Sequence, residues 1–484
     1  MAGLRMVRRD VHDVATNGRR IVFHVPTTAM FELDDAGVAV YDLFKSTGEI
    51  HAPDIERHFD GRFPAAEIAQ TIREFKELGI LVSGQAKATR RQPVAIRNFP
   101  LSTMVINVTT GCNLACDYCY KEDLTRPSGA IRMDFETAAR SIDLLLGESG
   151  DRERVNVVFF GGEPLSNMPL IKAVVAYAEG RCQALGKCPN FSLTTNATLL
   201  TEQSVDFLGG HNFAISLSID GPKAVHDRHR KTRRGAGSYD LVAEKTRMLL
   251  GRYKAGPVGA RVTVTAGAID VAAIHHHLFH ELGFTEVGFA PVTSDGSSRF
   301  KLTGDELAEF FENMKALGRS YRDAAIAGRN IGFSNLQKLL ADLHHGNRKT
   351  LPCGAGVGLL GVEPKGSLAL CHRFAGSDFQ TFGTVREGIR KDELARFLED
   401  AANLDDSSCR TCWIRNLCAG GCYHESYLNY HDPKSPTYLY CDLMRDWVDA
   451  AIECYDAILA RNPDFLAEHI GPRGPSGASM DMGG

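Results

Sequence analysis

The 484-residue sequence lacks several features that mark specialised classes of protein. No stretch reaches the roughly 18 apolar residues that a membrane-spanning helix needs. The N-terminal sequence has no apolar segment typical of a secretory signal. The net charge is only −4 at pH 7, which gives little support to a nucleic-acid-binding surface. These absences predict a cytoplasmic globular protein with neither a membrane nor a nucleic-acid partner.

Internal repeats are also absent, which excludes a solenoid. The last residues, from Gly471, contain few apolar side chains and are expected to be disordered. One basic run, His226 to Arg234, stands out from the balanced charge and is interpreted as a solvated loop.

Cysteine, by contrast, is plentiful, and ten of the thirteen cysteines fall into two spaced arrays. The first array is Cys112, Cys116 and Cys119, and the second is Cys353, Cys371, Cys409, Cys412, Cys418, Cys422 and Cys441. In a reducing compartment, closely spaced cysteines are metal ligands more often than disulfide partners. Cys182, Cys188 and Cys454 lie outside the arrays and are interpreted as core or surface thiols.

Changes of pattern along the chain predict five units. Residues 1–95 form a small separate module, residues 98–300 a barrel, residues 301–350 a helical connection, residues 351–460 the second cysteine domain, and residues 461–484 a tail. The polar stretch from Gly84 to Arg97 is a predicted linker.

The N-terminal module reads as strands followed by three short helices. A strand is expected from Arg20 to Pro26, and Asp34 can cap a first helix. Further helices are expected from Pro53 and from Pro64, the last ending at Gly79. This order predicts a winged-helix module.

From residue 102, short β-rich runs alternate with amphipathic helices. The expected strands are Met104–Val108, Val155–Phe160, Phe191–Thr195, Phe213–Ile219, Arg261–Val264 and Val287–Ala290. The expected helices include Asp134–Leu146, Leu170–Leu185, Tyr239–Leu250 and Val271–Leu282. Six such alternations predict the α/β class and a partial (β/α)6 TIM-like barrel, with function at the carboxyl ends of the strands.

The first array follows the first of these strands and supplies three thiolates. A [4Fe–4S] cluster takes four protein ligands when saturated, so one iron would stay open for another ligand. A zinc site lacks its fourth ligand here. His275, His276, His277 and His280 are far from the cysteines in sequence, and a solvated or capping role is expected for them.

Three motifs together resemble the radical S-adenosylmethionine (AdoMet) superfamily. They are CxxxCxxC with Tyr118 before its last cysteine, Gly161-Gly162-Glu163-Pro164, and Ser218-Ile219-Asp220-Gly221-Pro222. The resemblance implies that Gly161, Gly162 and Glu163 bind the amino group of AdoMet, with Pro164 closing their turn. It places Tyr118 near the adenine and Ser218 near the ribose. The resemblance assigns a cofactor-binding role less specifically to Thr195, Asn196 and Arg230. The implied chemistry is a 5′-deoxyadenosyl radical that abstracts hydrogen from unactivated carbon.

The second array resembles the SPASM extension of radical AdoMet enzymes that modify peptides. That resemblance assigns Cys409, Cys412, Cys418 and Cys441 to one auxiliary [4Fe–4S] cluster, and Cys353, Cys371 and Cys422 to another, making three clusters in total. Seven thiolates do not divide into closed four-ligand zinc sites. The three-cysteine set lacks the eighth cysteine of several relatives, so either His344 or His345 completes it, or its fourth site is open. We favour an open site that binds a substrate thiolate.

The N-terminal module resembles PqqD-like peptide-recognition elements, in which a leader segment adds a strand to a sheet edge. Residues Ile21 to Pro26 are expected near that edge, and the implied substrate is a ribosomally made, Cys-containing polypeptide. Over its length, and in the run Phe23–Asp34, the chain resembles the maturation enzymes of quinohemoprotein amine dehydrogenase. These join cysteine sulfur to methylene carbons of Asp or Glu in the small subunit. Asp220 or another acidic group would take the thiol proton, and a flavodoxin or ferredoxin would supply electrons.

Two other interpretations stay open. One keeps the radical chemistry but oxidises Ser or Cys to formylglycine, as sulfatase-maturing relatives do. The other is a non-catalytic electron-transfer protein that uses its clusters as wires.

Overall fold

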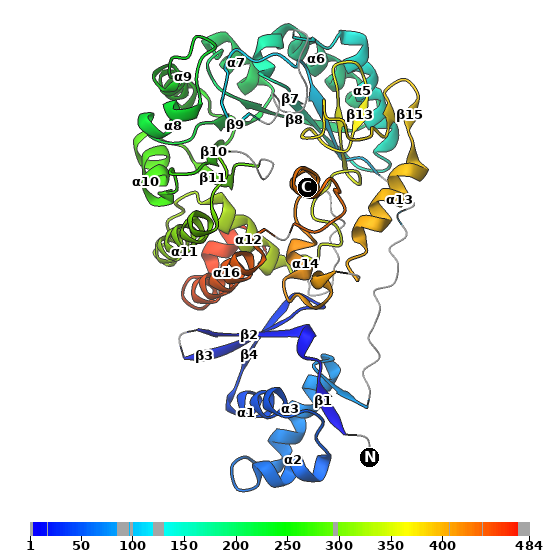
Figure 1. The fold of residues 1–484 in the computed structure, drawn as a ribbon, viewed down its shortest axis with the longest axis vertical. Coiled ribbons are helices and arrows are strands. Elements are labelled where there is room, and N and C mark those ends of the chain that lie inside the picture. The colour runs from blue at the N-terminus through cyan, green and yellow to red at the C-terminus, as the bar shows by residue number, and fades with distance from the viewer. Residues whose placement is uncertain are drawn as a thin grey trace.

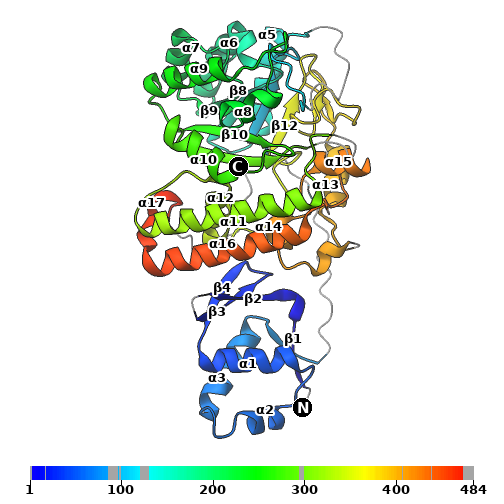
Figure 2. The same ribbon diagram turned by 60° about the vertical axis from the view of Figure 1, so that its left-hand side comes forward.

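The computed structural model describes residues 3–16, 18–84, 96, 100–119, 130–293, 299–405, 407–437 and 439–472. The predicted linker and the predicted disordered tail lie almost wholly outside these ranges. Three layers stack along the long axis (Figures 1 and 2), with an α/β unit at one end, helices in the middle and the N-terminal module at the other end. The middle layer contains α11 (Gly304–Ile326), α12 (Ser334–His345) and α16 (Cys441–Arg461). None of the helices in the described ranges is long and apolar enough to cross a membrane.

The α/β unit contains an eight-stranded sheet in the order β11-β10-β9-β8-β7-β6-β12-β13. The strands are β6 (Thr103–Asn107), β7 (Arg154–Phe160), β8 (Cys188–Thr195), β9 (Ala214–Ser218), β10 (Val258–Val264), β11 (Glu286–Pro291), β12 (Leu359–Val362) and β13 (Leu368–Ala369). Strands β6 to β11 are parallel to their neighbours. They match the six predicted strands, and the α/β class and barrel are confirmed.

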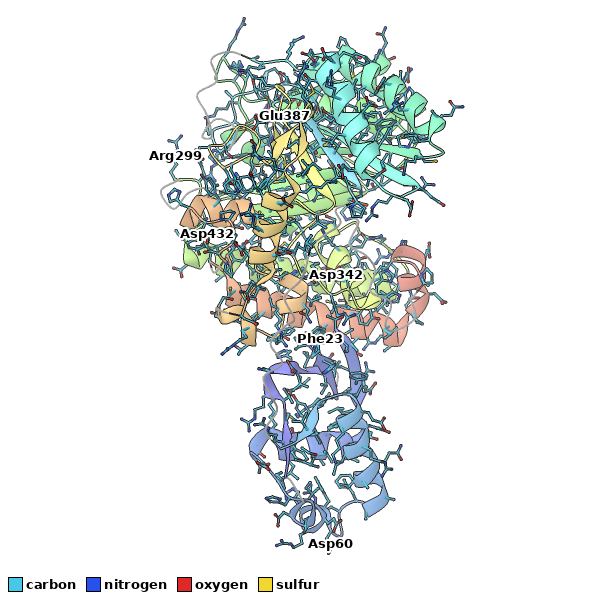
Figure 3. The ribbon with its side chains drawn as sticks, turned by 90° about the vertical axis from the view of Figure 1, so that its right-hand side faces the viewer. Phe23, Asp60, Arg299, Asp342, Glu387 and Asp432 are labelled. Atoms are coloured by element: carbon cyan, nitrogen blue, oxygen red, sulfur yellow. The ribbon has the colours of Figure 1, made fainter. Side chains whose placement is uncertain are left out.

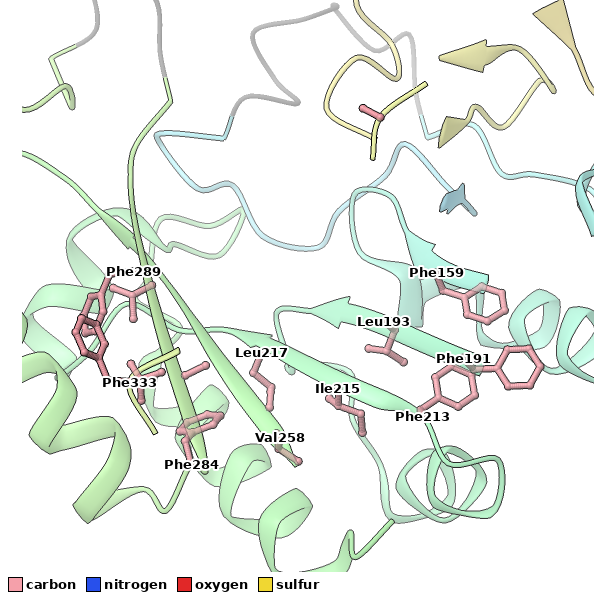
Figure 4. Packing of buried hydrophobic residues seen from close by; sticks show 14 of the residues in the cluster. Phe159, Phe191, Leu193, Phe213, Ile215, Leu217, Val258, Phe284, Phe289 and Phe333 are labelled. Carbon is pink, nitrogen blue, oxygen red and sulfur yellow. The ribbon is translucent and has the colours of Figure 1, made fainter. Parts of the chain in front are cut away.

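Helices connect these strands and cover the outside of the sheet (Figure 1). They are α5 (Phe135–Glu148), α6 (Met168–Ala184), α7 (Glu202–Gly210), α8 (Lys223–His229), α9 (Tyr239–Arg252) and α10 (Val271–His276), with the 3-10 helix η2 (Pro164–Asn167) and the π-helix η3 (His277–Glu281). The caps are local: Asp134 begins α5 by accepting from Thr137 N at 2.7 Å. Between sheet and helices, the rings of Phe159 in β7, Phe191 in β8 and Phe213, which directly precedes β9, stack on one another (Figure 4).

Strand β12 was not predicted, because it lies within the second cysteine region and far along the chain. It pairs in parallel with β6, and β13 pairs antiparallel with β12. The region therefore extends the barrel sheet. Its other elements are β14 (Gly383–Thr384), β15 (Gly388–Ile389), α13 (Lys391–Ala402), the 3-10 helix η4 (Ser408–Thr411), α14 (Arg415–Cys418) and α15 (Tyr423–Tyr430). Helix α17 (Pro463–His469) follows α16.

The N-terminal module has its own small core. Its elements are β1 (Leu4–Met6), the 3-10 helix η1 (Arg8–Asp10), β2 (Val11–Thr16), β3 (Arg19–His24), β4 (Ala29–Leu33), α1 (Asp35–Ser46), α2 (Ala52–Phe59), α3 (Ala65–Glu77) and β5 (Leu81–Ser83). The three predicted helices are confirmed, and the Asp34 side chain caps α1 by accepting from Gly37 N at 2.7 Å. Strand β1 pairs with β5, and β2, β3 and β4 form a separate antiparallel sheet.

The predicted sheet edge is corrected by this topology. Strand β3, which covers most of the expected segment, lies between β2 and β4. Its side chains alternate: Ile21 and Phe23 pack into the core shared with the barrel, while Val22 packs into the core of the module. Phe23 lies where the N-terminal module meets the rest of the protein (Figure 3). Because β2 contacts α16, β4 is the edge that a further strand can join.

Candidate active site

A cavity of about 200 Å³ opens at the carboxyl ends of the barrel strands. Eleven of the predicted site residues line it: Cys112, Cys116, Tyr118, Cys119, Gly161, Gly162, Glu163, Thr195, Asn196, Ser218 and Arg230. Pro164 instead begins η2 behind the turn. The sequence did not indicate the remaining lining residues, Phe160, Thr194, Thr263, Ala290, Pro291, Val292, Thr293 and Arg373. Most of these follow from the same rule of strand ends, whereas Arg373 comes from the second cysteine region.

The glycine turn after β7 holds the loop that leads to the first cysteine. A Cβ on Gly161 would lie 2.4 Å from Thr109 O, and one on Gly162 would lie 2.3 Å from Gly111 O. Gly161 also has a φ of +147°, which disfavours other residues. Gly162 N donates to Thr109 O at 2.9 Å. Glycine is therefore required so that turn and loop can touch.

Glu163 is buried at the floor of this turn. Burial raises the pKa of Glu163 to about 7, although hydrogen bonds from Thr195, Asn196 N and Leu165 N oppose the rise. Thr195 Oγ1 donates to Oε1 at 2.6 Å, and Asn196 N donates to Oε2 at 2.8 Å. These bonds join the ends of β7 and β8 and set the carboxylate toward the cavity, where a cationic amino group would be a complementary partner.

Tyr118, Asp220 and Arg230 form a buried cluster beside the first array. Both Tyr118 Oη and Arg230 Nε donate to Asp220 Oδ2, the latter at 2.9 Å. Thr263 N donates to Asp220 Oδ1 at 3.0 Å, and the Arg230 guanidinium lies 5.4 Å from the Tyr118 ring centre. With three donors on its carboxylate, Asp220 positions Arg230 and Tyr118, and its role as a catalytic base stays a prediction.

The basic run is a solvated loop only in part. It begins within α8, where His226 is buried, and Arg230 is buried in the cavity wall, whereas Arg233 and Arg234 are exposed. His226 Nε2 bonds with Ser238 Oγ at 3.0 Å. Burial, together with the charge of Arg230, lowers the pKa of His226 to about 4. The sequence shows a cluster of basic residues but not that Asp220 neutralises one of them, Arg230.

The three thiols of the first array fit an iron–sulfur cluster. Burial raises the pKa of Cys112 to about 11 and that of Cys116 to about 12, so buried thiolates here need a cationic partner such as iron. Cys112 Sγ accepts from Leu114 N at 3.4 Å and from Asn196 Nδ2 at 3.6 Å. Hydrogen bonds to sulfur of this kind tune the potential of a bound cluster.

Four cysteines of the second array line a second cavity, of about 240 Å³. They are Cys409, Cys412, Cys418 and Cys441, the set assigned to one auxiliary cluster. Burial raises the pKa of Cys418 to about 11. Arg445 Nη1 contacts Cys412 Sγ at 3.9 Å, which places a positive charge beside the thiols. This arrangement fits a closed cluster with protein ligands only.

The remaining thiols, Cys353, Cys371 and Cys422, interact electrostatically with one another. Cys353 is exposed at the surface, yet desolvation by the surrounding protein raises the pKa of its thiol to about 12. The neighbouring Tyr423 hydroxyl is buried and has no hydrogen-bond partner among the described residues, which fits a group such as a cluster sulfur beside it.

His344 does not complete this three-thiol set in the structure. Its Nδ1 bonds with Tyr455 Oη and its Nε2 with Gly471 O, both at 3.1 Å. His345 Nδ1 is buried, and its ring packs edge-on against His344. Both ring nitrogens of His344 have protein partners. The fourth position of the cluster is therefore either open or filled by His345.

A solvated or capping role was expected for the histidines of α10 and η3, but His275 is buried and both it and His277 bond to protein groups. His275 Nε2 bonds with Ile331 O at 2.8 Å, and His277 bonds with both Tyr239 and Glu281. Within the described ranges, no three His, Cys, Asp or Glu side chains surround a single metal-ion position. In a four-iron cluster each thiolate binds its own iron, so cluster ligands need not converge on one point.

The radical SAM superfamily model matches residues 106–265, which run from the end of β6 to the end of β10 and include the first array. The match identifies a radical SAM domain in this part of the chain. Such a domain implies AdoMet and one [4Fe–4S] cluster, and the three cysteines of the first array lie within it.

Curated relatives of this chain include two sulfatase-maturating enzymes. The serine-type anaerobic enzyme of Klebsiella aerogenes is 27% identical over 361 residues, 69% of this chain and 84% of that protein. The cysteine-type anaerobic enzyme of Clostridium perfringens strain 13 is 26% identical over 340 residues, 67% of this chain and 89% of that protein.

Two solved structures share the fold. Native anSMEcpe with bound AdoMet has a TM-score of 0.62 and 20% identity, covering 76% of this chain and 99% of that one. Streptococcus suis SuiB bound to its precursor peptide SuiA has a TM-score of 0.50 and 15% identity, covering 90% of this chain and 99% of that one. The fold is thus that of a radical SAM TIM-like barrel with a SPASM-type C-terminal domain.

Proposed function

We propose that this radical SAM chain is a maturation enzyme that joins cysteine sulfur to the methylene carbon of Asp or Glu within a ribosomally made polypeptide. The proposed substrate is the small subunit of quinohemoprotein amine dehydrogenase. The coarser part, a radical SAM enzyme acting on a peptide or protein, is supported by the relatives and by the fold. The finer part depends on the three-thiol set.

The residues that would hold the cofactors fall into three groups. Cys112, Cys116 and Cys119 would hold the AdoMet-binding cluster, while Glu163, which lines the same cavity, would accept hydrogen bonds from the AdoMet amino group. The four cysteines of the second cavity and the three-thiol set would hold two auxiliary clusters. When bound, these groups supply a carbon radical that abstracts hydrogen and an acceptor for one electron.

The reaction balances with these parts. The methylene loses a hydrogen atom, the thiol loses a proton, one carbon–sulfur bond forms, and one electron leaves the substrate. The product is therefore two hydrogens lighter. What the protein must do is hold the thiol and the methylene together and keep water away, and an open site among Cys353, Cys371 and Cys422 supports the first task.

A leader segment of the substrate is proposed to pair with β4. Its outer edge has no strand partner among the described residues, and strand addition satisfies such an edge with main-chain hydrogen bonds. The SuiB structure, solved with its precursor peptide, covers more of this chain than anSMEcpe does. On adding leader peptide, backbone amides of residues 29–33 should gain hydrogen-exchange protection. Protection confined to other segments would contradict docking at β4.

The formylglycine alternative is favoured by the names of the sulfatase-maturating relatives. It needs a single Ser or Cys to be oxidised and does not need an acidic side chain. The non-catalytic alternative requires that AdoMet is not cleaved under strong reductant.

The deciding experiment is anaerobic reconstitution with iron and sulfide, followed by AdoMet, reductant and the candidate Cys-rich polypeptide. Mass spectrometry should show a product two hydrogens lighter per crosslink, with Cys- and Asp- or Glu-containing fragments joined. A product that reacts with a hydrazide, with no joined fragments, would select formylglycine chemistry. Failure to form 5′-deoxyadenosine would select the electron-transfer interpretation.

A further inference from the structure

The two arginines that line the active-site cavity have different surroundings. Arg230 is buried and forms its ion pair with Asp220 inside the wall. Arg373 is half-buried, and its Nη1 donates to the neutral hydroxyl of Thr293 at 2.9 Å. Arg373 therefore brings a guanidinium to the wall of the cavity that Arg230 and Tyr118 also line.

The position of Arg373 in the chain links this charge to the three-thiol set. Cys371 follows β13 of the barrel sheet, and Arg373 is two residues further on. Two residues span at most about 7 Å. The same short segment thus offers a thiol to the auxiliary set and a guanidinium to the AdoMet cavity.

The guanidinium also interacts electrostatically with the C-terminal domain. Its charge acts on Glu425, which accepts from Tyr440 Oη at 2.7 Å. The hydrogen bond to Thr293 directs the side chain to the cavity wall that both residues line. A positioned fork of N–H donors matches a carboxylate, which it can bind through two parallel hydrogen bonds.

We propose that Arg373 binds the side-chain carboxylate of the substrate Asp or Glu whose methylene is modified. This rests on the proposed thioether function. The carboxylate is one or two bonds from that methylene, so fixing it on Arg373 directs the methylene into the cavity. A thiolate at the three-thiol set would then lie beside the same carbon. Arg373 thereby selects acidic residues over their amides.

The cavity also receives the carboxylate of AdoMet, which has the same chemistry. The test therefore measures each ligand separately on reconstituted holoenzyme. AdoMet affinity is measured without peptide, and peptide affinity is measured by fluorescence anisotropy with AdoMet present but no reductant. The probes are three synthetic substrate peptides that carry Asp, Asn or Ala at the modified position.

We expect wild type to bind the Asp peptide roughly ten- to a hundredfold more tightly than the Asn peptide, the range of a charge-assisted contact. Arg373→Gln should reduce that preference to less than about threefold, and Arg373→Lys should keep part of it because charge remains while the fork is lost. Arg386→Gln is the matched control, since Arg386 is exposed and pairs with Glu136 at 3.1 Å on the surface.

Three results would overturn the proposal. An Asp preference that persists in Arg373→Gln places the carboxylate elsewhere. A loss of AdoMet affinity in both variants, without peptide, assigns Arg373 to AdoMet. Equal binding of the Asp and Asn peptides by wild type would show that the protein has no carboxylate-selective subsite. Because these are binding measurements, a wild-type product that proves to be an aldehyde would refute the proposed function separately. Iron content shows that each variant is folded and loaded.

Discussion

His12 of the N-terminal sheet stacks on Trp413, with ring centroids 3.7 Å apart and planes 5° from parallel. Trp413 directly follows Cys412 of the four-cysteine cavity. Arg415 Nη2 bonds to Asp10 Oδ1 at 2.5 Å, and Asn416 Nδ2 to Val25 O at 2.6 Å. The loop between two predicted cluster ligands is therefore also the surface on which the N-terminal module docks.

The stacked rings of His12 and Trp413 should make a measurable joint contribution to the free energy of unfolding. A double-mutant cycle of His12→Ala and Trp413→Ala should give a coupling free energy of about 0.5–1.5 kcal/mol, measured by urea unfolding. His12→Ala combined with Phe59→Ala is the control, because Phe59 lies in the module's separate core. Additive effects of His12 and Trp413 would mean that the stack contributes nothing.

Gly162→Ala should displace the loop that carries Cys112. The new Cβ would meet Gly111 O, and such overpacking typically costs about 1–3 kcal/mol of unfolding free energy. AdoMet affinity, measured by equilibrium dialysis on the reconstituted enzyme, should fall more than tenfold. Gly180→Ala in α6 is the matched control, since no atom lies within 4 Å of its Cβ position. There we expect unchanged AdoMet binding and a gain of roughly 0.5–1 kcal/mol; equal behaviour of both variants would contradict the close contact.

His226 should make stability depend on pH. Its pKa is about 4 when folded and near 6.5 when unfolded, so between these values the unfolded chain binds the additional proton. The contribution of neutral His226 is complete above pH 6.5 and is lost as pH falls toward 4. By linkage the loss is roughly 3 kcal/mol. Urea unfolding at pH 7 and pH 5 should show a smaller pH effect in His226→Asn than in wild type, while exposed His276→Asn should match wild type.

Asp220→Asn should leave Arg230 buried without its counter-ion. Breaking a buried pair on one side typically costs about 3–5 kcal/mol. The double variant Asp220→Asn/Arg230→Gln should recover part of that loss, because no uncompensated charge remains. If Asp220 were a base and nothing more, the single variant would unfold at the same urea concentration as wild type and lose only turnover.

The barrel was predictable because its strands are continuous apolar runs with turn signals at their ends, and the cavity residues follow from the parallel order of those strands. Strand β12 was not predictable in the same way, since only pairing with β6, about 250 residues earlier in sequence, defines it. Arg373 was missed for the same reason. The edge expected near Ile21–Pro26 was wrong because β3 pairs with a strand on each side, β2 and β4, and pairing on both sides makes it the central strand.

Iron content tests the division of the ten cysteines. Three [4Fe–4S] clusters require about 12 irons per chain. Replacing Cys112, Cys116 and Cys119 by Ala should remove about four, and replacing Cys409 and Cys412 by Ala should remove another four independently. Cys188→Ser is the matched control, because Cys188 is exposed and outside both arrays; the iron content of this variant should equal that of wild type.

The two cysteine sets are spatially separate, since Cys409 and Cys412 line a cavity that shares no residue with the one at Cys112. Loss of all iron from either variant would therefore contradict independent clusters, and an unchanged count in the Cys409/Cys412 variant would exclude those residues as ligands.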